Sequence, residues 1–535
     1  MTSSPPLSHV PLYPSRRSPV FAKNMVAASH PLAAQAGLSM LSAGGNAVDA
    51  ALATAISLTV VEPTGNGLGS DAFAILWDGT ELHGLNASGR SPAAWTPDRF
   101  AGLDRMPFQG WESVTVPGAV SGWVALSERF GALPFERLFE PAVRYAEDGF
   151  AVTPSVAGVW AWGCESLHDK PGFAETFMPQ GRPVRAGEWF RNRDLATSLR
   201  LIAETRGEAF YRGPLAEKIA AFARGHGAVL SETDLAENVC DWCGTLSQTF
   251  DDQTLHEIPP NGQGLAALMA LALLDHTSVR DFGPDDPRAW HLMAEAMKLA
   301  FADIHAHLAD PLAMDKVRAE YLLDAGYIAD RAKLIDPMRA TDHGPGVPNH
   351  GSTVCLAAAD EDGRMVSFIQ SNYAGFGSGV VVLGTGIHLQ NRGAGFSLTP
   401  GHPNQVGPRK RPKHTIIPGF VTKSGQPHMA FGVMGGPMQP QGHVQMVLRT
   451  GLWGQNVQSA ADAPRWRVTG GMGLALETSV PSDLAAALAD LGHHITAEQP
   501  ERAFGFGGAQ LIAKNPGGGY VGGSDPRKDG HAVGF

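Results

Sequence analysis

Cysteine is scarce in this chain of 535 residues, which contains only Cys164, Cys240, Cys243 and Cys355. Four cysteines in a chain of this length do not make the dense disulfide framework of small secreted domains. Cys240 and Cys243 form a single CxxC pair, and no second pair supplies the other ligands of a structural zinc site. We therefore interpret these two residues as small, partly buried side chains.

Charge is also sparse, and positive charge is not in excess. Charged residues make up 17% of the chain, and 41 Lys and Arg against 52 Asp and Glu give a net charge of −11. Nucleic-acid binding needs clustered cations, so the composition indicates no nucleic-acid partner. Hydrophobic residues reach 43%, and Gly and Pro together stay below the ~25–30% of low-complexity chains. The chain is therefore expected to be folded, loop-rich and long enough for two to four structural units.

Long hydrophobic runs are absent as well. No run approaches the ~18–20 residues of a transmembrane helix, so we predict no membrane partner. The first fourteen residues contain four prolines and no apolar core of a secretory signal. We expect a disordered arm up to about Asn24 and a cytoplasmic protein, which the low cysteine content also favours.

Helical signals dominate the first two thirds of the chain. The helix predicted over Pro31–Leu41 ends at Gly44-Gly45, and Asn46 with Asp49 can cap an alanine-rich helix that follows. Two extended runs, Ala72–Trp77 and Leu82–Leu85, flank an Asp-Gly turn and predict a hairpin. Further helices are predicted over Ala119–Phe130, Leu195–Arg206, Pro214–Gly225, Gly264–Leu274 and Ala289–Ala309, with one extended passage over Thr249–Ile258.

Strand signals dominate the last third. The segment Asp336–His350 is polar, with three prolines and two glycines, and is typical of a flexible linker. Strands in two blocks, with helical layers around them, predict a mixed α/β (α+β) fold, a four-layer αββα sandwich. The strands predicted after the linker are Thr353–Ala359, Met365–Ile369, Gly379–Leu383, Ile387–Leu389, Ile416–Val421, His428–Val433, Ala509–Ile512 and Tyr520–Val521, with one helix over Gln441–Arg449.

Histidines are present, but their spacing does not suit a metal. His305 and His307 lie two apart beside Asp303 on a predicted helix, so the two imidazoles point about 200° apart. Asp303 and His307 alone leave a site incomplete. We interpret these residues and the adjacent His493-His494 as structural, and we predict no metal and no cofactor. The glycine loop Gly65–Gly69 lacks the Lys-Ser/Thr of a phosphate-binding loop.

The order of linker, Ser352-Thr353 and strand is the one that a self-processing enzyme with an N-terminal nucleophile needs. Cleavage of the Ser352–Thr353 bond frees the α-amine of Thr353, whose unperturbed pKa is about 7.7–8.0. That amine can act as the base for the Thr353 hydroxyl. Threonine at the start of a strand is also common, because β-branched residues favour strands. The pattern alone therefore favours the structural interpretation.

Several motifs spread along the chain change this balance. They are Gly44-Gly45-Asn46-Ala47-Val48-Asp49-Ala50-Ala51, Val116-Pro117-Gly118-Ala119-Val120, Pro259-Pro260-Asn261-Gly262-Gln263-Gly264, Gly375-Phe376-Gly377-Ser378-Gly379, Gly435-Gly436 and Asp525-Pro526-Arg527-Lys528-Asp529-Gly530. Through these motifs together the chain resembles the γ-glutamyltransferase family over nearly its whole length. The resemblance implies an αββα fold of the N-terminal nucleophile hydrolase type. It also implies self-cleavage into a large subunit (1–352, with the linker at its end) and a small subunit (353–535), and it allows a dimer of such heterodimers.

The resemblance assigns a role to several positions. In the family the nucleophilic threonine lies seven residues before an Asp-x-Asp-Gly turn, which here is 360–363, so the nucleophile is Thr353. The family's paired glycines match Gly435-Gly436, whose N–H groups would form an oxyanion hole. Without the resemblance this pair is a plain turn before a helix. Asn372 matches an asparagine that binds substrate or nucleophile, and Ser371 would orient the Thr353 hydroxyl.

The chain departs from the family where a glutamyl donor is held. Members that act on γ-glutamyl groups hold the donor's ammonium with a Gln and an Asp, and Arg392 and Gly395 stand there in this chain. The pocket thus loses an acid and gains a cation. Arg392 can bind a carboxylate through two parallel hydrogen bonds. The alternative for Arg392 is a surface ion pair. Another acid could replace the lost one, and Asp71 and Glu62 near the glycine loop are the first candidates.

Two further substrate-binding positions also differ. The family's adjacent serines correspond to His414-Thr415, and His414 would favour a carboxylate. The family's carboxylate-binding arginine lies four residues before a proline, whereas Arg90 lies two residues before Pro92. The pattern resembles the cytoplasmic, amidohydrolase-type branch of the family, which includes an enzyme acting on oxamate.

The sequence therefore predicts an amidohydrolase that cleaves a small carboxylate-bearing amide such as oxamate through an acyl-enzyme on Thr353. The first alternative is a γ-glutamyltransferase or glutathione hydrolase. A second, from another class, is a non-catalytic relative that never cleaves itself.

Overall fold

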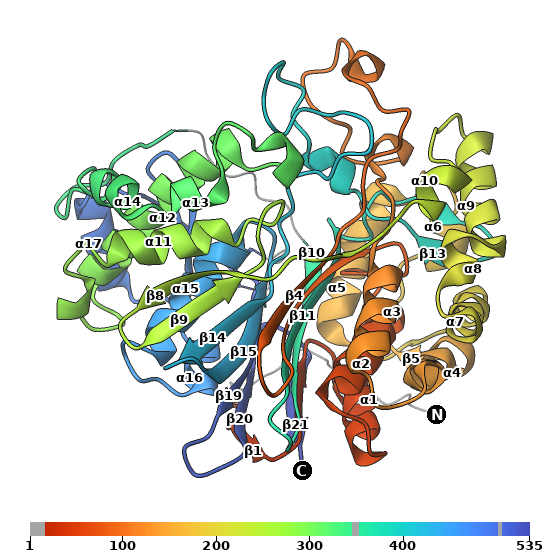
Figure 1. The fold of residues 1–535 in the computed structure, drawn as a ribbon, viewed down its shortest axis with the longest axis horizontal. Helices are drawn as coiled ribbons and strands as arrows, with labels where there is room; N and C mark the ends of the chain where they lie inside the picture. Colours follow the sequence, from red (N-terminus) through yellow and green to blue (C-terminus); the bar gives the residue numbers. More distant parts are fainter. Residues whose placement is uncertain (1–15, 345–351, 501–504) are drawn as a thin grey trace, which may run out of the picture.

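Two seven-stranded antiparallel sheets lie face to face at the centre of the molecule (Figure 1). The computed structural model describes residues 16–344, 352–500 and 505–535. The first sheet contains, in spatial order, β1 (Val20–Ala22), β20 (Tyr520–Ser524), β19 (Gly508–Lys514), β15 (Gln426–Met434), β14 (Gly419–Lys423), β9 (Gln253–Glu257) and β8 (Leu246–Phe250). The second contains β21 (His531–Gly534), β2 (Met25–Ala28), β10 (Ser352–Ala359), β11 (Met365–Tyr373), β3 (Asp71–Trp77), β4 (Leu82–Ala87) and β7 (Asp241–Trp242).

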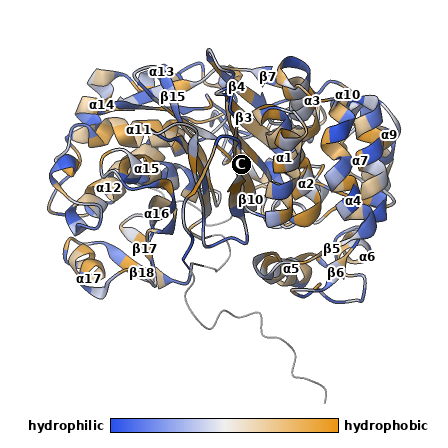
Figure 2. Ribbon diagram, turned by 90° about the horizontal axis from the view of Figure 1, so that it is seen from below, coloured by the Kyte–Doolittle hydropathy of each residue, from blue (hydrophilic) through white to orange (hydrophobic). Residues whose placement is uncertain are grey.

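Helices cover the outer face of each sheet, which confirms the predicted αββα sandwich (Figure 2). Apolar side chains fill the space between the sheets and both spaces between sheet and helices. The main helices over the second sheet are α1 (Pro31–Ser42), α2 (Ala47–Val61), α3 (Ala119–Phe130), α4 (Glu140–Asp148), α7 (Arg193–Thr205) and α9 (Pro214–Gly225). Those over the first sheet include α11 (Leu265–Leu274), α12 (Pro287–His307), α15 (Met438–Thr450) and α16 (Val457–Asp462).

Helix α2 supports the strand that contains Thr353. The side chain of Asn46 accepts hydrogen bonds from the N–H groups of Val48 and Asp49, and the Asp49 carboxylate accepts one from the N–H of Asn46. This reciprocal cap satisfies donors that a helix start leaves free. Every residue of α2 is buried, and its small alanine side chains allow a close approach to β10 and β11. The turn after β10 is attached too, because Asp360 accepts from the N–H of Ala47.

Both sheets mix strands from the two sides of the Ser352–Thr353 bond. In the second sheet β10 lies between β2 and β11, and in the first sheet β14 lies between β15 and β9. Cleavage of that single bond would therefore leave two pieces that share both sheets and all three apolar layers. The predicted division at 352/353 would therefore not separate two independently packed units.

Some boundaries differ from the sequence prediction. The arm expected to be disordered up to Asn24 contains strand β1, which pairs with β20, while residues 1–15 lie outside the described part. The passage Thr249–Ile258 is part of a hairpin, β8 and β9, because Asp251 takes a left-handed conformation (φ 55°) at the turn. The linker is described only as far as 344. No helix of the described residues is long and apolar enough to span a bilayer.

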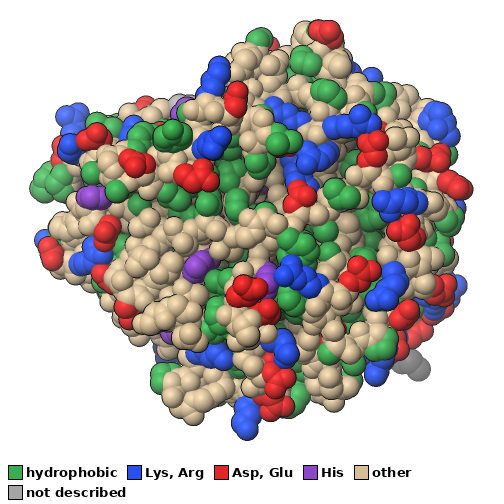
Figure 3. Space-filling view, viewed as in Figure 1, with side chains coloured by type: hydrophobic (Ala, Val, Ile, Leu, Met, Phe, Trp, Pro, Cys, Tyr) green, Lys and Arg blue, Asp and Glu red, His purple; other side chains and the backbone are tan. Residues whose placement is uncertain are grey.

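Charges of both signs alternate over the face shown in Figure 3, as the small net charge for this length predicts.

Candidate active site

The side chain of Thr353 is fully buried near the start of β10, in the middle of its sheet. The pairing with β11 is irregular between Ser352 and Val354, which is the kind of local bulge found beside active sites. The Thr353 hydroxyl donates a hydrogen bond to Oγ of Ser371 at 3.1 Å. The amide nitrogen of Gln439, in the first turn of α15, lies 3.5 Å from the same hydroxyl. The structure thus places Ser371 where the sequence analysis expected it.

Ser371 connects Thr353 to a buried arginine. Its Oγ accepts from Nη2 of Arg392 at 2.9 Å and from the N–H of Tyr373 at 2.8 Å. Nη1 of Arg392 donates to Oγ1 of Thr415 at 2.7 Å. Four residues from four separate segments therefore form one continuous chain of hydrogen bonds around the predicted nucleophile.

Arg392 is buried, so the surface ion pair considered for it is wrong. Among the described residues no carboxylate lies within ion-pair distance of its guanidinium, and its Nε has no hydrogen-bond partner. The guanidinium carbon lies 4.7 Å from the centre of the Tyr373 ring. Burial lowers the pKa of Arg392 to about 10, partly offset by Asp71 and Tyr373. The group therefore remains a cation at neutral pH.

Asp71 is the carboxylate that most affects the charge of Arg392, but both of its oxygens already accept hydrogen bonds from other groups. It lies opposite Ser371 in the β3–β11 register. Its Oδ1 accepts from the N–H groups of Gly89 and Gly118 at 3.0 and 3.1 Å. Burial raises the pKa of Asp71 to about 7, although Arg392 and these N–H groups favour the ionised form.

Both ring nitrogens of His414 are hydrogen-bonded within the protein. Its Nδ1 accepts from the N–H of Ile416, which assigns the proton to Nε2, and Nε2 donates to Oδ2 of Asp71 at 3.1 Å. Burial, and then the positive charges of Arg392 and Arg411, hold the pKa of His414 well below its usual value. His414 is therefore a neutral donor that orients Asp71, and its role in binding a substrate carboxylate stays a prediction.

The glycine loop packs behind the nucleophile, a role that its sequence did not reveal. A Cβ on Gly65 would lie 3.0 Å from the Val354 side chain and 3.5 Å from the Thr353 backbone, so a side chain there would crowd Val354. The carbonyl of Gly65 accepts from the N–H of Asn372, and Ser70 donates to Oδ1 of Asn372 at 2.7 Å. Nδ2 of Asn372 is buried without a partner among the described residues, so it is a donor open to a substrate.

Gly435 and Gly436 form the turn between β15 and α15, with φ values of 116° and 59° that favour glycine. No backbone carbonyl of the described chain accepts from either N–H. Gln263 joins this turn to the substrate-binding segment, since its amide donates to the carbonyls of Gly436 and Thr415. Neither Gln263 nor Gln439 was singled out from the sequence as a site residue, because their role depends on segments far apart in the chain.

Arg90, Glu62 and Gly395 are not joined to this group by any side-chain hydrogen bond. Arg90 is partly exposed and pairs with Asp310 at 3.2 Å. Glu62 accepts from Ser29 at 2.6 Å, and burial raises its pKa to about 7. A Cβ on Gly395 would lie 2.9 Å from the carbonyl oxygen of Lys413, so the backbone there leaves little room for a side chain.

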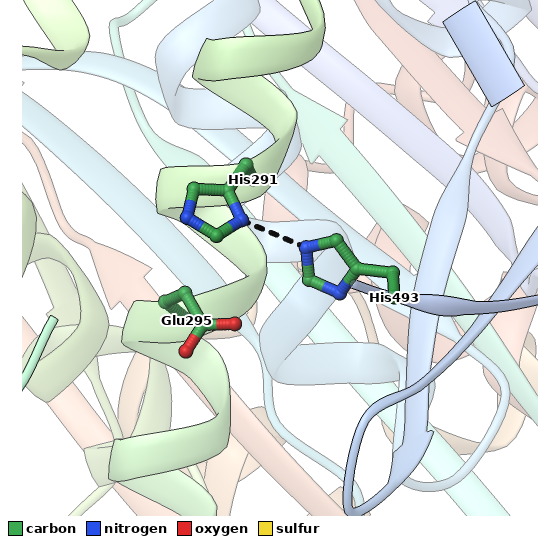
Figure 4. A group of neighbouring side chains, drawn as sticks. All are labelled: His291, Glu295 and His493. Atoms are coloured by element: carbon green, nitrogen blue, oxygen red, sulfur yellow. Dashed lines mark hydrogen bonds between the residues drawn. The ribbon is translucent and has the colours of Figure 1, made fainter. Parts of the chain in front are cut away.

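A separate buried group of possible metal ligands contains His291 and Glu295 of α12 and His493, which lies just before β18 (His494–Glu498) (Figure 4). Nδ1 of His291 and Nε2 of His493 share a hydrogen bond of 2.8 Å. The Glu295 carboxylate pairs with the Lys298 ammonium at 2.5 Å and with His343 at 3.2 Å. The donors already satisfy one another beside a fixed positive charge, so we interpret this group as a polar network that holds 336–343 against α12.

The sequence analysis also considered Asp303 and the two cysteines of the CxxC pair for metal or redox chemistry. Asp303 pairs with Arg331 at 2.9 Å rather than with His307. Cys240 and Cys243 are free thiols, and burial raises the pKa of each.

Known proteins resemble this chain along its length. The family described as Gamma-glutamyltranspeptidase matches residues 33–535. An oxamate amidohydrolase proenzyme of Klebsiella pneumoniae is 38% identical over 97% of this chain and 99% of its own. A glutathione hydrolase-like proenzyme of Bacillus subtilis is 36% identical over 97% of this chain and 100% of its own. A cephalosporin acylase from Bacillus halodurans superposes with a TM-score of 0.93 at 47% identity, covering 100% of this chain and 99% of its own.

Proposed function

The chain belongs to the gamma-glutamyltranspeptidase family of amide-hydrolysing enzymes, and we propose that it cleaves itself at Ser352–Thr353 and then hydrolyses a small carboxylate-bearing amide such as oxamate. Arg392 carries the second half of this proposal. It is a buried guanidinium close to Thr353, its Nε has no hydrogen-bond partner, and no carboxylate of residues 16–344, 352–500 or 505–535 pairs with it.

Thr353 would act through its own α-amine. Once the Ser352–Thr353 bond is broken, the amine takes the hydroxyl proton as Oγ1 attacks the amide carbon. The N–H groups of Gly435 and Gly436 would stabilise the oxyanion, since they point to no backbone acceptor among the described residues. The tetrahedral intermediate expels ammonia, which leaves with the proton, and an ester on Thr353 remains. Water then hydrolyses the ester and restores the threonine.

The unused N–H donors of Arg392 support a carboxylate as its ligand. A guanidinium has five N–H donors, and within the described part of the chain two hydrogen bonds, to Ser371 and Thr415, use them. The remaining donors, Nε included, can bind both oxygens of a carboxylate. A buried cation left without such a partner is costly, so anion binding stabilises the site as well as orienting the substrate.

The short hydrogen-bond path favours a short substrate. Ser371 Oγ lies 2.9 Å from Nη2 of Arg392 and 3.1 Å from the Thr353 hydroxyl, so these two groups are at most about 6 Å apart. In oxamate the carboxylate is bonded directly to the amide carbon. A carboxylate on Arg392 would therefore bring that carbon within reach of Thr353. In a γ-glutamyl donor, by contrast, three carbons separate the amide carbon from the α-carboxylate.

Glutathione hydrolysis or γ-glutamyl transfer is the alternative, and hydrolases of glutathione are among the relatives. A γ-glutamyl donor needs an acid for its ammonium group. Gly395 has no side chain, Asp71 already accepts three hydrogen bonds, and Glu62 is held by Ser29. Arg392 would also repel the ammonium, by about 4 kcal/mol at ~4 Å and an effective dielectric of ~20 before screening.

Two assays on the purified chain separate these proposals. A denaturing gel should show two fragments, and N-terminal sequencing of the smaller should begin Thr-Val-Cys-Leu. Ammonia release from oxamate should exceed cleavage of a γ-glutamyl anilide, with little stimulation by glycylglycine. A single full-length band would support the non-catalytic alternative. Efficient transfer from the γ-glutamyl anilide would replace the oxamate proposal with the glutamyl one.

A further inference from the structure

Tyr373 has an unusual backbone conformation directly beside the candidate site. Its φ is 80°, the largest among the non-glycine residues of the described chain with positive φ. Such a conformation costs about 1–3 kcal/mol for a bulky residue and persists only where the surroundings enforce it. The other such residues are Arg206, Asp251, Phe376, Arg409 and Ser424.

The surroundings hold Tyr373 in this conformation. Its N–H donates to Oγ of Ser371, the oxygen that also accepts from Thr353 and Arg392. The ring centre lies 5.9 Å from that of Phe108 in an edge-on contact, and 4.7 Å from the guanidinium carbon of Arg392. The strained backbone therefore puts an aromatic face directly against the guanidinium.

The face of an aromatic ring and a carboxylate stabilise a buried cation in different ways. A carboxylate would neutralise Arg392 and occupy the donors that a substrate needs, whereas the face of a ring attracts the guanidinium without accepting its N–H bonds. All the N–H donors lie in the guanidinium plane, so a ring over the guanidinium carbon takes up none of the donors that Ser371 and Thr415 leave for an anion. Burial raises the pKa of the Tyr373 phenol, so the ring adds no negative charge of its own at neutral pH.

We propose that Tyr373 is a positioning and specificity-determining residue: its ring, fixed by a strained backbone beside the nucleophile, holds Arg392 cationic and correctly turned to select small planar carboxylates. This inference deepens the proposed function and depends on it. Tyr373 acts through Arg392 and takes no part in bond making or breaking.

The test compares Tyr373→Phe with Tyr373→Leu. Phenylalanine keeps the aromatic face, and leucine keeps apolar bulk without it. With oxamate we expect Tyr373→Leu to raise KM about 5–30-fold with a smaller change in kcat, the range of a desolvated cation–π contact. Tyr373→Phe should stay within about threefold of the wild-type KM. With pyruvamide, in which an acetyl group replaces the carboxylate, the effect of Tyr373→Leu should be smaller than with oxamate.

Arg206→Gly is a matched control for the backbone. Arg206 also has a positive φ, 49°, but it ends helix α7 away from the site. Glycine there should leave oxamate hydrolysis unchanged and should not lower the urea midpoint. Tyr373→Gly also relieves the strain of a positive φ, but it removes the ring. This variant should therefore lose affinity for oxamate although its backbone is unstrained.

Failure of the inference and of the proposed function give different results. If the wild type hydrolyses oxamate and Tyr373→Leu matches it in KM, the inference is wrong and the function stands. Equal losses on oxamate and pyruvamide would also overturn it, by showing a general structural defect. If the wild type hydrolyses neither amide, calorimetric titration with oxamate tests whether Tyr373 contributes to carboxylate binding. Binding that Tyr373→Leu weakens and Tyr373→Phe retains would support the inference, and its absence would overturn both.

Discussion

Two buried arginine clusters in this molecule are built in opposite ways. In the C-terminal ion cluster, Arg465 pairs with Asp525 at 2.5 Å, and Arg527 pairs with Glu477 at 2.5 Å and with Asp525 at 3.1 Å. Against the effect of burial, the two arginines hold the pKa of Asp525 at about 2. Arg392 has hydroxyls and an aromatic ring around it, and no carboxylate is paired with it among the described residues.

The difference separates a structural cluster from a binding site. Buried ions that are matched one to one need nothing more, and losing one partner leaves an uncompensated charge. A buried cation with unused donors is an incomplete pair that an anionic ligand can complete. Substitutions in the C-terminal ion cluster should therefore act on folding, and substitutions around Arg392 should act on substrate.

The largest effect is expected for Thr353→Ala. Without the hydroxyl neither self-cleavage nor acyl transfer can occur, so the chain should remain at 535 residues and lose at least ~10⁴-fold in activity. Its urea midpoint should match that of an uncleaved wild-type sample. Thr353→Ser, which keeps a hydroxyl, is the control and should still yield two fragments. Cleavage of Thr353→Ala at the same bond would contradict the nucleophile assignment.

Asp525→Asn should have the next largest effect, which is a loss of folding stability rather than of activity. It leaves Arg465 and Arg527 short of a negative charge inside the protein, which costs about 3–5 kcal/mol of unfolding free energy. Urea denaturation followed by tryptophan fluorescence measures this. Oxamate hydrolysis per folded molecule should be nearly unchanged below the transition. A stable but inactive Asp525→Asn would place this cluster in the site instead.

Arg392→Met should do the opposite of Asp525→Asn, with lower activity and unchanged or higher stability. We expect a loss of about 10–100-fold or more in kcat/KM for oxamate, because charged hydrogen bonds contribute about 1.5–3 kcal/mol, and a smaller loss for pyruvamide. Stability should hold or rise, since the substitution removes a buried cation that lacks a counter-ion. Arg465→Met is the matched control, because it leaves Asp525 short of its partner and should destabilise the fold. Equal losses on both amides would make Arg392 structural.

Local signals explain how well the sequence predicted the fold. The predicted helices over Ala119–Phe130 and Pro214–Gly225 coincide with α3 and α9, because their glycine and proline boundaries lie within the segments themselves. Strand β1 was missed, because three residues without a clear pattern become a strand only by pairing with β20, some 500 residues away. Such pairing is invisible in local propensity.

The site shows the same division. Thr353 and Gly435-Gly436 were predicted as site residues through the family resemblance, whereas the charge state of His414 depended on neighbours that only the fold supplies. A histidine two residues before a strand-forming segment gives no sign that Asp71 lies 3.1 Å away. Tyr373 was passed over for the same reason, since neither its positive φ nor its contact with Arg392 has a local signal.

The smallest predicted effect is a pH dependence that only one cluster should show. The pKa of Asp525 is about 2, so this carboxylate does not titrate between pH 5 and 9, whereas the pKa of Asp71 is raised to about 7. Below that pH Asp71 is neutral and Arg392 acts on a ligand with its full charge. Above it the Asp71 carboxylate offsets part of that charge.

The inhibition constant of a monocarboxylate inhibitor should therefore increase about 3–10-fold between pH 6 and pH 8, which corresponds to a coupling of about 0.6–1.4 kcal/mol. The pKa of Arg392, about 10, lies outside this range, so its own titration does not contribute. The inhibition constant is the right readout, because kcat rises over the same range as the Thr353 amine loses its proton. Arg392→Met should bind the inhibitor weakly at every pH and lose the slope. A slope that survives in Arg392→Met would assign the pH dependence to a group other than the Asp71–Arg392 pair.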